Sequence, residues 1–142
     1  MESRKETLGF LLVDVTRQMR RAFQRQLEGS SLTQAQSRAL VYVSLHEGVR
    51  QVELAELLEV QPITLARLLD QLAEAGLVER RPDPEDRRAY QVFLTPAAAP
   101  HLAAIEQVSA AIRAEALRNL DDHQIATVMH ALRTMRDNLA AR

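Results

Sequence analysis

The chain has 142 residues, of which 46% are hydrophobic and 26% charged, and its formal net charge is −1. This length suffices for one domain with a sizeable core, and the hydrophobic fraction excludes a disordered or fibrous protein. The absence of cysteine excludes a disulfide framework, a thiolate metal site and a thiol redox switch. No stretch approaches the roughly 18 apolar residues of a membrane span, so we expect a cytoplasmic protein.

The basic residues leave nucleic-acid binding open. A near-neutral, slightly acidic chain is not an obvious nucleic-acid binder. However, 17 of the 18 basic residues are Arg, and only Lys5 is Lys. Guanidinium groups bind phosphates and guanine edges through two hydrogen bonds at once, although GC-rich coding would produce the same bias.

Helical periodicity marks the first part of the chain. Residues 8–27 carry apolar side chains at the spacing of an amphipathic helix, and Gly29 follows their end. Thr33 and Gln36 then have the spacing of a capping box, which predicts a second helix running to about His46.

A compact pair of helices follows over residues 51–59 and 62–75. Pro62 suits the first position of the second helix because its missing N–H is not needed there, and Gly76 ends that helix. Two helices joined by a tight turn predict a helix-turn-helix, although any small helical hairpin would have the same pattern.

The next segments predict a β-hairpin. Residues 77–81 and 90–94 have the pattern of strands, and residues 82–88 between them have the Pro and Asp content of an exposed turn. A hairpin directly after a helix-turn-helix is the wing of a winged-helix domain. It needs the helices to cover it, because a lone hairpin is barely stable in water.

The remainder of the chain is predicted to be helical. Thr95 is the expected N-cap and Pro96 the first helical residue, while Pro100 predicts a kink or a delayed start. Asp121 or Asp122 is expected to cap the last helix.

Several motifs occur in a characteristic order. They are Leu32-Thr33-x-x-Gln36, Leu68-Leu69-Asp70-x-Leu72, Ala75-Gly76-Leu77-Val78 before Arg80-Arg81, and Asp83-Pro84-Glu85-Asp86-Arg87-Arg88-Ala89 before Leu94-Thr95. In that order and spacing they closely resemble the MarR family of bacterial transcription regulators, over essentially the whole chain. The run Gln61-Pro62-x-x-x-x-Arg67-x-Leu69-Asp70-Gln71-Leu72, with Thr95 and Pro100, looks most like the SlyA branch of that family.

The resemblance implies a mainly helical fold with a small β-hairpin. Residues 32–96 would form a winged helix-turn-helix that binds DNA, and residues 1–31 and 97–142 would form a helical region that dimerises. The residues favour the dimer independently, since the terminal helices carry more apolar surface than one small domain can cover. The alternative is an intramolecular helical bundle.

The helix over residues 62–75 is the expected reader of the DNA major groove. Its outward-facing candidates for base contacts are Gln61, Pro62, Thr64 and Arg67. Arg67 is the expected guanine contact, because a guanidinium group matches the two acceptors of a guanine edge. The alternative is an ordinary solvated helix face.

In the wing, the family pattern places an Arg in the minor groove, steadied by an Asp. Asp86 and Arg88 match that spacing and Arg87 is adjacent, so either Arg could enter the groove. A narrow A·T-rich minor groove attracts an inserted Arg through its enhanced negative potential. The alternative is a turn stabilised by a surface ion pair.

Further contacts are expected with the phosphate backbone. Arg80 and Arg81 lie on the first strand of the predicted wing, and the helix starts near Thr33 and Gln51 can offer backbone N–H groups to phosphates.

The resemblance also implies a small effector, often an aromatic or phenolic anion, bound between the dimer region and the winged domain. Arg17 and Thr33 are the polar candidates for that pocket, although Arg17 also fits a solvated stripe with Arg20, Arg21 and Arg25. The peroxide-sensing variant of the family is excluded because it needs a reactive cysteine.

Nothing in the sequence indicates an enzyme, a cofactor or a metal site. The four His residues do not form a ligand set, and no catalytic triad signature, phosphate-binding loop or dinucleotide fingerprint is present. We therefore expect a homodimeric transcription regulator, a repressor that binds a pseudo-palindromic operator in double-stranded DNA and is released by a small ligand. The alternative is a winged-helix module for protein contacts with little specific DNA binding.

Overall fold

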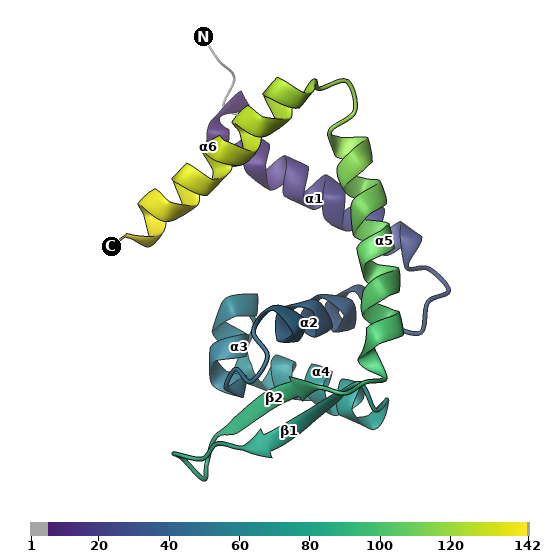
Figure 1. The fold of residues 1–142 in the computed structure, drawn as a ribbon, viewed down its shortest axis with the longest axis vertical. Helices are drawn as coiled ribbons and strands as arrows, with labels where there is room; N and C mark the ends of the chain where they lie inside the picture. The colour runs from purple at the N-terminus through teal and green to yellow at the C-terminus, as the bar shows by residue number, and fades with distance from the viewer. Residues whose placement is uncertain (1–5, 142) are drawn as a thin grey trace.

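The computed structural model describes residues 6–141, which are mainly helical with one two-stranded sheet (Figure 1). The elements in chain order are α1 (Leu8–Gln26), α2 (Gln34–Leu45), α3 (Gln51–Leu58), α4 (Pro62–Glu74), β1 (Val78–Pro82), β2 (Tyr90–Leu94), α5 (Ala98–Ala116) and α6 (Asp122–Ala140). Elements α2 to β2 form one unit, and α5 leads from the hairpin to α6 at the far end (Figure 1). The predicted winged-helix fold is confirmed.

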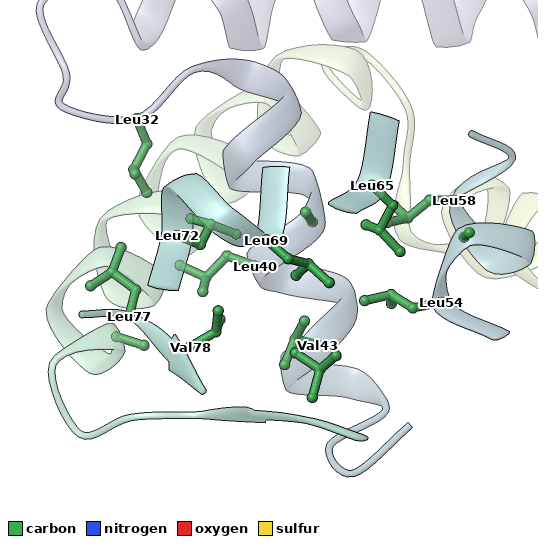
Figure 2. Packing of buried hydrophobic residues seen from close by; sticks show 14 of the residues in the cluster. Leu32, Leu40, Val43, Leu54, Leu58, Leu65, Leu69, Leu72, Leu77 and Val78 are labelled. Atoms are coloured by element: carbon green, nitrogen blue, oxygen red, sulfur yellow. The ribbon is translucent and has the colours of Figure 1, made fainter. Parts of the chain in front are cut away.

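The core of this unit is a layer of leucines shared by the three helices. Leu65, Leu69 and Leu72 of α4 are fully buried, and they pack with Leu40 of α2 and Leu54 of α3 (Figure 2). The hairpin closes this core with Val78 and Val92, which is why the strands persist although the sheet has only two of them.

The turn between α3 and α4 contains a residue in the left-handed conformation. Glu59 follows the end of α3 with φ 54° and ψ 44°, and the N–H of Val60 donates to the carbonyl of Ala55 at 3.1 Å. This arrangement provides a hydrogen-bond donor for a backbone carbonyl at the end of α3 and turns the chain toward α4. A side chain with a Cβ is disfavoured in this region of backbone space.

The hairpin is attached to the helices by a third segment of extended chain. Strands β1 and β2 are antiparallel, with Val78 opposite Leu94 and Arg80 opposite Val92. The N–H of Gly48 donates to the carbonyl of Val92, and the N–H of Val92 donates to the carbonyl of Val49, both at 2.9 Å. The loop before α3 therefore pairs with β2 and anchors the hairpin to the helix-turn-helix.

Two helix starts have the side-chain caps expected from the sequence. The Thr33 hydroxyl accepts from the N–H of Gln36, whose side chain accepts in return from the N–H of Thr33. Asp121 caps α6 in the same reciprocal manner with Gln124. Of the two expected acidic caps, Asp121 is therefore the one used.

The expected cap at Thr95 is wrong. Helix α5 begins at Ala98 with Ala97 as its N-cap, and no side chain caps it. The Thr95 hydroxyl donates instead to the carbonyl of Gly76, and the N–H of Thr95 donates to that of Leu77, so this residue joins the end of β2 to the end of α4. The delayed start expected from Pro100 is confirmed, because a proline in the first turn loses no helical hydrogen bond.

The terminal helices expose much of their apolar surface. Helix α1 packs against α5, yet neither α1 nor α6 contains a buried residue. Their exposed large apolar side chains are Leu8, Phe10, Leu11, Leu12, Val13, Val15 and Met19 on α1, and Val128, Met129, Leu132 and Leu139 on α6. Within residues 6–141, no helix is both long and apolar enough to cross a membrane.

Replacing Glu59 by Gly is expected to stabilise the protein. Glycine adopts the left-handed conformation at no steric cost, and the relief exceeds the extra chain entropy lost on folding by about 0.5–1 kcal/mol. Urea unfolding at a fixed protein concentration measures this gain. Glu59→Ala is the control, because it removes the same carboxylate but keeps the Cβ; equal stability of the two variants would show that charge, and not backbone conformation, matters here.

Candidate nucleic-acid interface

One face of the molecule is formed by the start of α4 and the turn of the hairpin. The four residues predicted to contact bases, Gln61, Pro62, Thr64 and Arg67, are all exposed there. They are exposed because the leucines of α4 occupy the opposite side of the helix. Pro62 is the first helical residue, as expected, and Ile63 beside it is 64% exposed.

Three exposed arginines, one on α4 and two in the turn of the hairpin, have free guanidinium groups. Among the residues that the structure describes, the side chains of Arg67, Arg87 and Arg88 form no hydrogen bond, ion pair or ring contact. Cations without partners can accept an anionic ligand without breaking any bond within the protein.

The turn that carries Arg87 and Arg88 is organised by Asp83. The Asp83 side chain is only 4% exposed, and it accepts from the N–H of Glu85 at 2.8 Å and of Asp86 at 3.3 Å. It also accepts from Nε of Arg50 at 2.7 Å, which ties the turn to the start of α3. Asp83 belongs to a motif of the sequence, but neither its role nor that of Arg50 could be predicted there, because the two residues are 33 positions apart.

The same contacts shift two pKa values. The N–H of Glu85 and the Arg50 guanidinium hold the pKa of Asp83 below its ordinary value, because both stabilise the carboxylate. The hydrogen bond and charge of Asp83 in turn raise the pKa of Arg50. This ion pair therefore stays charged throughout the neutral range, and the turn it supports keeps its shape there.

Asp86 acts on the main chain of the turn and not on a guanidinium group. Its Oδ1 accepts from the backbone N–H of Arg88 at 2.9 Å. Within residues 6–141, no ion pair joins Asp86 to the side chain of Arg87 or Arg88. Asp86 thus contacts the main chain at Arg88, because a carboxylate two residues back readily reaches the backbone N–H.

A cleft of about 270 Å³ separates the turn of the hairpin from the starts of α3 and α4. Arg50, Gln51, Pro62, Arg88 and Tyr90 line it. It brings Gln51, a predicted phosphate contact, to the same recess as Arg88, a predicted groove contact. Tyr90, which sequence analysis did not single out as a contact, adds an exposed phenol to the recess.

The two arginines of β1 are engaged within the protein. Arg80 donates from Nε to the Gln51 side chain and from Nη2 to the carbonyl of Ala66, both at 3.0 Å. Arg81 points to the other face of the strand, where it pairs with Glu79 and stacks 3.9 Å from the Phe93 ring centroid. Neither presents a free guanidinium group, and a phosphate contact by either residue would have to share or replace these partners.

The two residues predicted for an effector pocket, Arg17 and Thr33, do not line the cavity between α1, α2 and α5, although Arg17 lines a separate hollow along α1. Arg17 pairs with Asp14 at 2.8 Å on the exposed side of α1, and the Thr33 hydroxyl is used to cap α2. That cavity has a volume of about 420 Å³ and is lined by other residues. Periodicity indicates which residues share a helix face but not which faces enclose a space, so the residues of this cavity could not be named from it.

The cavity combines an apolar lining with cationic and hydroxyl groups. Phe23, Tyr42 and Ile105 supply apolar surface, and Arg20, Arg38 and Arg113 supply positive charge. The Ser37 hydroxyl also lines it, fully buried and without a hydrogen-bond partner in the described part of the chain. A serine on the leucine-bearing side of α2 was the one sequence signal that could have indicated this site.

Comparison with known proteins places these features in a family context. A sequence model of the MarR family matches residues 32–90. The apo form of wild-type MarR from E. coli is 30% identical, with 91% of this chain and 96% of that chain covered and a TM-score of 0.80. A structure described as the multiple antibiotic resistance repressor MarR is 31% identical, with 91% and 94% covered and a TM-score of 0.81. A mutant of MarR from E. coli, solved in complex with operator DNA, is 29% identical, with 95% and 99% covered and a TM-score of 0.75.

The Asp83–Arg50 pair predicts a pH dependence of stability. Because the pKa of Asp83 is lowered in the folded protein, its contribution is complete above the unfolded value of about 3.9 and is lost as the pH falls through the folded value. The difference in urea midpoint between wild type and Asp83→Asn is therefore expected to be largest near neutral pH and to shrink below about pH 4.

Glu85→Gln is the control for that experiment. Glu85 lies 3.9 Å from the same Arg50 guanidinium but its side chain is 87% exposed, so its removal is expected to change the midpoint little. A difference between wild type and Asp83→Asn that stays constant from pH 7 to pH 3 would contradict the assigned role of the Asp83 carboxylate.

Proposed function

This chain belongs to the MarR family of DNA-binding transcription regulators, and on that premise we propose that it is a homodimeric repressor of the SlyA-like branch that binds a pseudo-palindromic operator. The observation that carries the proposal is the set of free guanidinium groups of Arg67 on α4 and of Arg87 and Arg88 in the turn of the hairpin. The similarity to a MarR mutant solved with operator DNA and to a protein named as a repressor supports it.

We propose that the start of α4 reads the major groove. Arg67 can donate two hydrogen bonds to the O6 and N7 acceptors of a guanine. Thr64 and Gln61 are placed for bases or phosphates one turn earlier, and the exposed Ile63 and Pro62 can contact a thymine methyl group. Three buried leucines hold α4 against the core, so the exposed side of the helix keeps a fixed position.

The turn between the strands is proposed to enter the minor groove beside it. Arg87 and Arg88 stand at the end of the hairpin, and the buried Asp83 fixes the turn that carries them. Between α4 and this turn lies the cleft lined by Gln51 and Tyr90, where a phosphate backbone would pass. Arg81, exposed at the outer face, remains a candidate for a further phosphate contact.

The proposed dimer would bury the apolar faces of the terminal helices. Neither α1 nor α6 has a buried residue in the single chain, and the exposed side chains named above exceed what a monomer in water ordinarily leaves uncovered. Residues 1–31 and 97–142 are thus proposed as the dimerisation region and residues 32–96 as the reading unit. Two such units predict half-sites about one helical turn, ~34–36 Å, apart.

The proposal is tested with the operator selected from random duplexes by the purified protein. Arg67→Ala and Arg88→Ala are each expected to weaken operator binding at least about fivefold, and Arg67→Ala should also relax preference at one base pair of each half-site. Fluorescence anisotropy at two salt concentrations measures both effects. Arg118→Ala is the control, since within residues 6–141 this exposed residue forms an ion pair only with Glu115, at the far end of α5.

Two outcomes of that titration would contradict the proposal. Unchanged affinity in both variants would show that these arginines do not contact DNA. Wild-type protein that binds every duplex equally weakly would favour the alternative, a winged-helix module for protein contacts.

We further propose that the cavity between α1, α2 and α5 holds the effector, a small aromatic anion. Its apolar walls fit a ring, and Arg20, Arg38 and Arg113 fit a carboxylate or phenolate. The buried Ser37 hydroxyl, which has no partner among the described residues, would gain one from the ligand.

Arg38 provides a route from this cavity to the DNA-reading face. Its Nη1 donates to the carbonyl of Leu58 at 3.1 Å, and Leu58 is the last residue of α3 before the turn into α4. Its guanidinium also lies 5.3 Å from the Tyr42 ring centroid. An anion in the cavity would compete for the guanidinium, release the Leu58 carbonyl and favour an arrangement of α4 that does not fit the operator.

Benzoate serves as the probe of this site, with benzamide as its uncharged counterpart. Benzoate is expected to raise the thermal midpoint and to weaken operator binding in wild type, because the anion can pair with the cavity arginines. Arg38→Met should abolish the effect on DNA binding. Equal effects of benzoate and benzamide, or an undiminished effect in Arg38→Met, would contradict the proposed site.

A further inference from the structure

We propose that Arg80 is a positioning residue for DNA reading: it locks α4 to the hairpin so that the two contact their grooves together. This inference rests on the proposed DNA binding, and it assigns Arg80 a role other than the phosphate contact expected from its place in the sequence.

Arg80 connects three separate elements through one guanidinium group. From β1 it reaches the first residue of α3 by donating from Nε to the Gln51 side chain at 3.0 Å. Its Nη2 donates to the carbonyl of Ala66 at 3.0 Å and lies 2.7 Å from Oδ1 of Asp70, both in α4. The hairpin, α3 and α4 are the three elements that surround the proposed path of the DNA.

The geometry leaves Arg80 poorly placed to bind a phosphate. Its side chain is only 23% exposed, and its Nε and Nη2 atoms, which form one edge of the guanidinium fork, are both engaged by the protein. Arg81, the next residue, lies on the opposite face of the strand and is 55% exposed. The two adjacent arginines therefore differ in role because successive side chains of a strand point to opposite faces.

Helix α4 is also held on its other flank. Nε2 of Gln36 donates to Oε1 of Gln71 at 2.7 Å, and Gln36 is itself fixed because its Oε1 accepts from the N–H of Thr33. At 100° per residue, Arg67 lies between the flank that carries Asp70 and the flank that carries Gln71. The guanine-reading side chain thus stands between two polar contacts that prevent α4 from rolling.

Locking matters because the two groove contacts are made by different elements. Arg67 belongs to α4, whereas Arg87 and Arg88 belong to the turn of the hairpin, so both sites are satisfied only at one relative position of the two elements. An error of about an ångström costs a directional hydrogen bond to a base but not the diffuse attraction to phosphates. Loss of Arg80 should therefore lower specific binding and spare non-specific binding.

The test compares Arg80→Met, Arg80→Lys and Asp70→Asn with wild type on the selected operator and on a scrambled duplex. Arg80→Met is expected to weaken operator binding about tenfold, with scrambled binding and the slope of affinity against salt unchanged. Arg80→Lys should fail to restore it, because an ammonium group keeps the charge but cannot span Gln51, Ala66 and Asp70. Asp70→Asn should also weaken operator binding, although removing a negative charge near DNA would by itself strengthen it.

A second measurement needs no DNA, and Arg81→Met is its matched control. Amide hydrogen exchange within residues 62–74 of the free protein should accelerate in Arg80→Met and Asp70→Asn but not in Arg81→Met, because only the first two variants release α4. If Arg80→Met does not fold, Asp70→Asn, whose side chain is 68% exposed, carries the test.

Three results would overturn the proposal. Equal losses on operator and scrambled DNA, with a shallower salt slope, would make Arg80 a phosphate contact. Restoration by Arg80→Lys would show that charge alone suffices. Unchanged exchange in α4 would show that Arg80 does not hold the helix. Wild-type protein without sequence preference would instead refute the proposed function, and the exchange measurement would still decide the role of Arg80.

Discussion

The burial of Leu65, Leu69 and Leu72 is the constraint on which the reading face depends. These three side chains fix the rotation of α4 about its own axis, because turning the helix would expose leucine to water at a cost of about 1.5–3 kcal/mol for each side chain. Their opposite side, with Thr64 and Arg67, is thereby directed outward. The polar contacts of Arg80 and Gln36 refine a position that the leucines set, since directional bonds act over shorter distances than apolar packing.

The net charge of this protein was a poor guide to nucleic-acid binding, because some of its charged residues form ion pairs with one another and others are unpaired. Between residues 62 and 95 there are five Arg and six acidic residues, so even this region is not basic in sum. The structure pairs Arg80 with Asp70 and Arg81 with Glu79, and it pairs Asp83 with Arg50 from the loop before α3. Arg67, Arg87 and Arg88 remain exposed, and their guanidinium groups have no partner among the described residues. Such a surface attracts DNA weakly at long range and depends on contacts of defined shape.

Local patterns predicted the elements well, whereas contacts between distant residues were not predictable. Pro62, Thr33 and Asp121 start helices as expected, because capping depends on residues three or four apart. Thr95 failed as a cap since its hydroxyl bonds to Gly76, which is 19 residues earlier. Likewise the roles of Arg50, Arg38 and Ser37 depend on which helix faces meet, and the spacing of residues along one chain does not carry that information.

Helix α2 has two faces with different contacts, and the residues of one face can be substituted without changing those of the other. Ser37 and Tyr42 line the cavity, while Gln36 and Leu40 contact α4. Arg38 is the one side chain of α2 that both lines the cavity and donates a hydrogen bond to the end of α3. If the cavity holds the proposed effector, substitutions on the first face would change which molecule it binds without disturbing the helix proposed to face DNA. The effector and the operator could then change independently during evolution, provided that the proposed connection at Arg38 is kept.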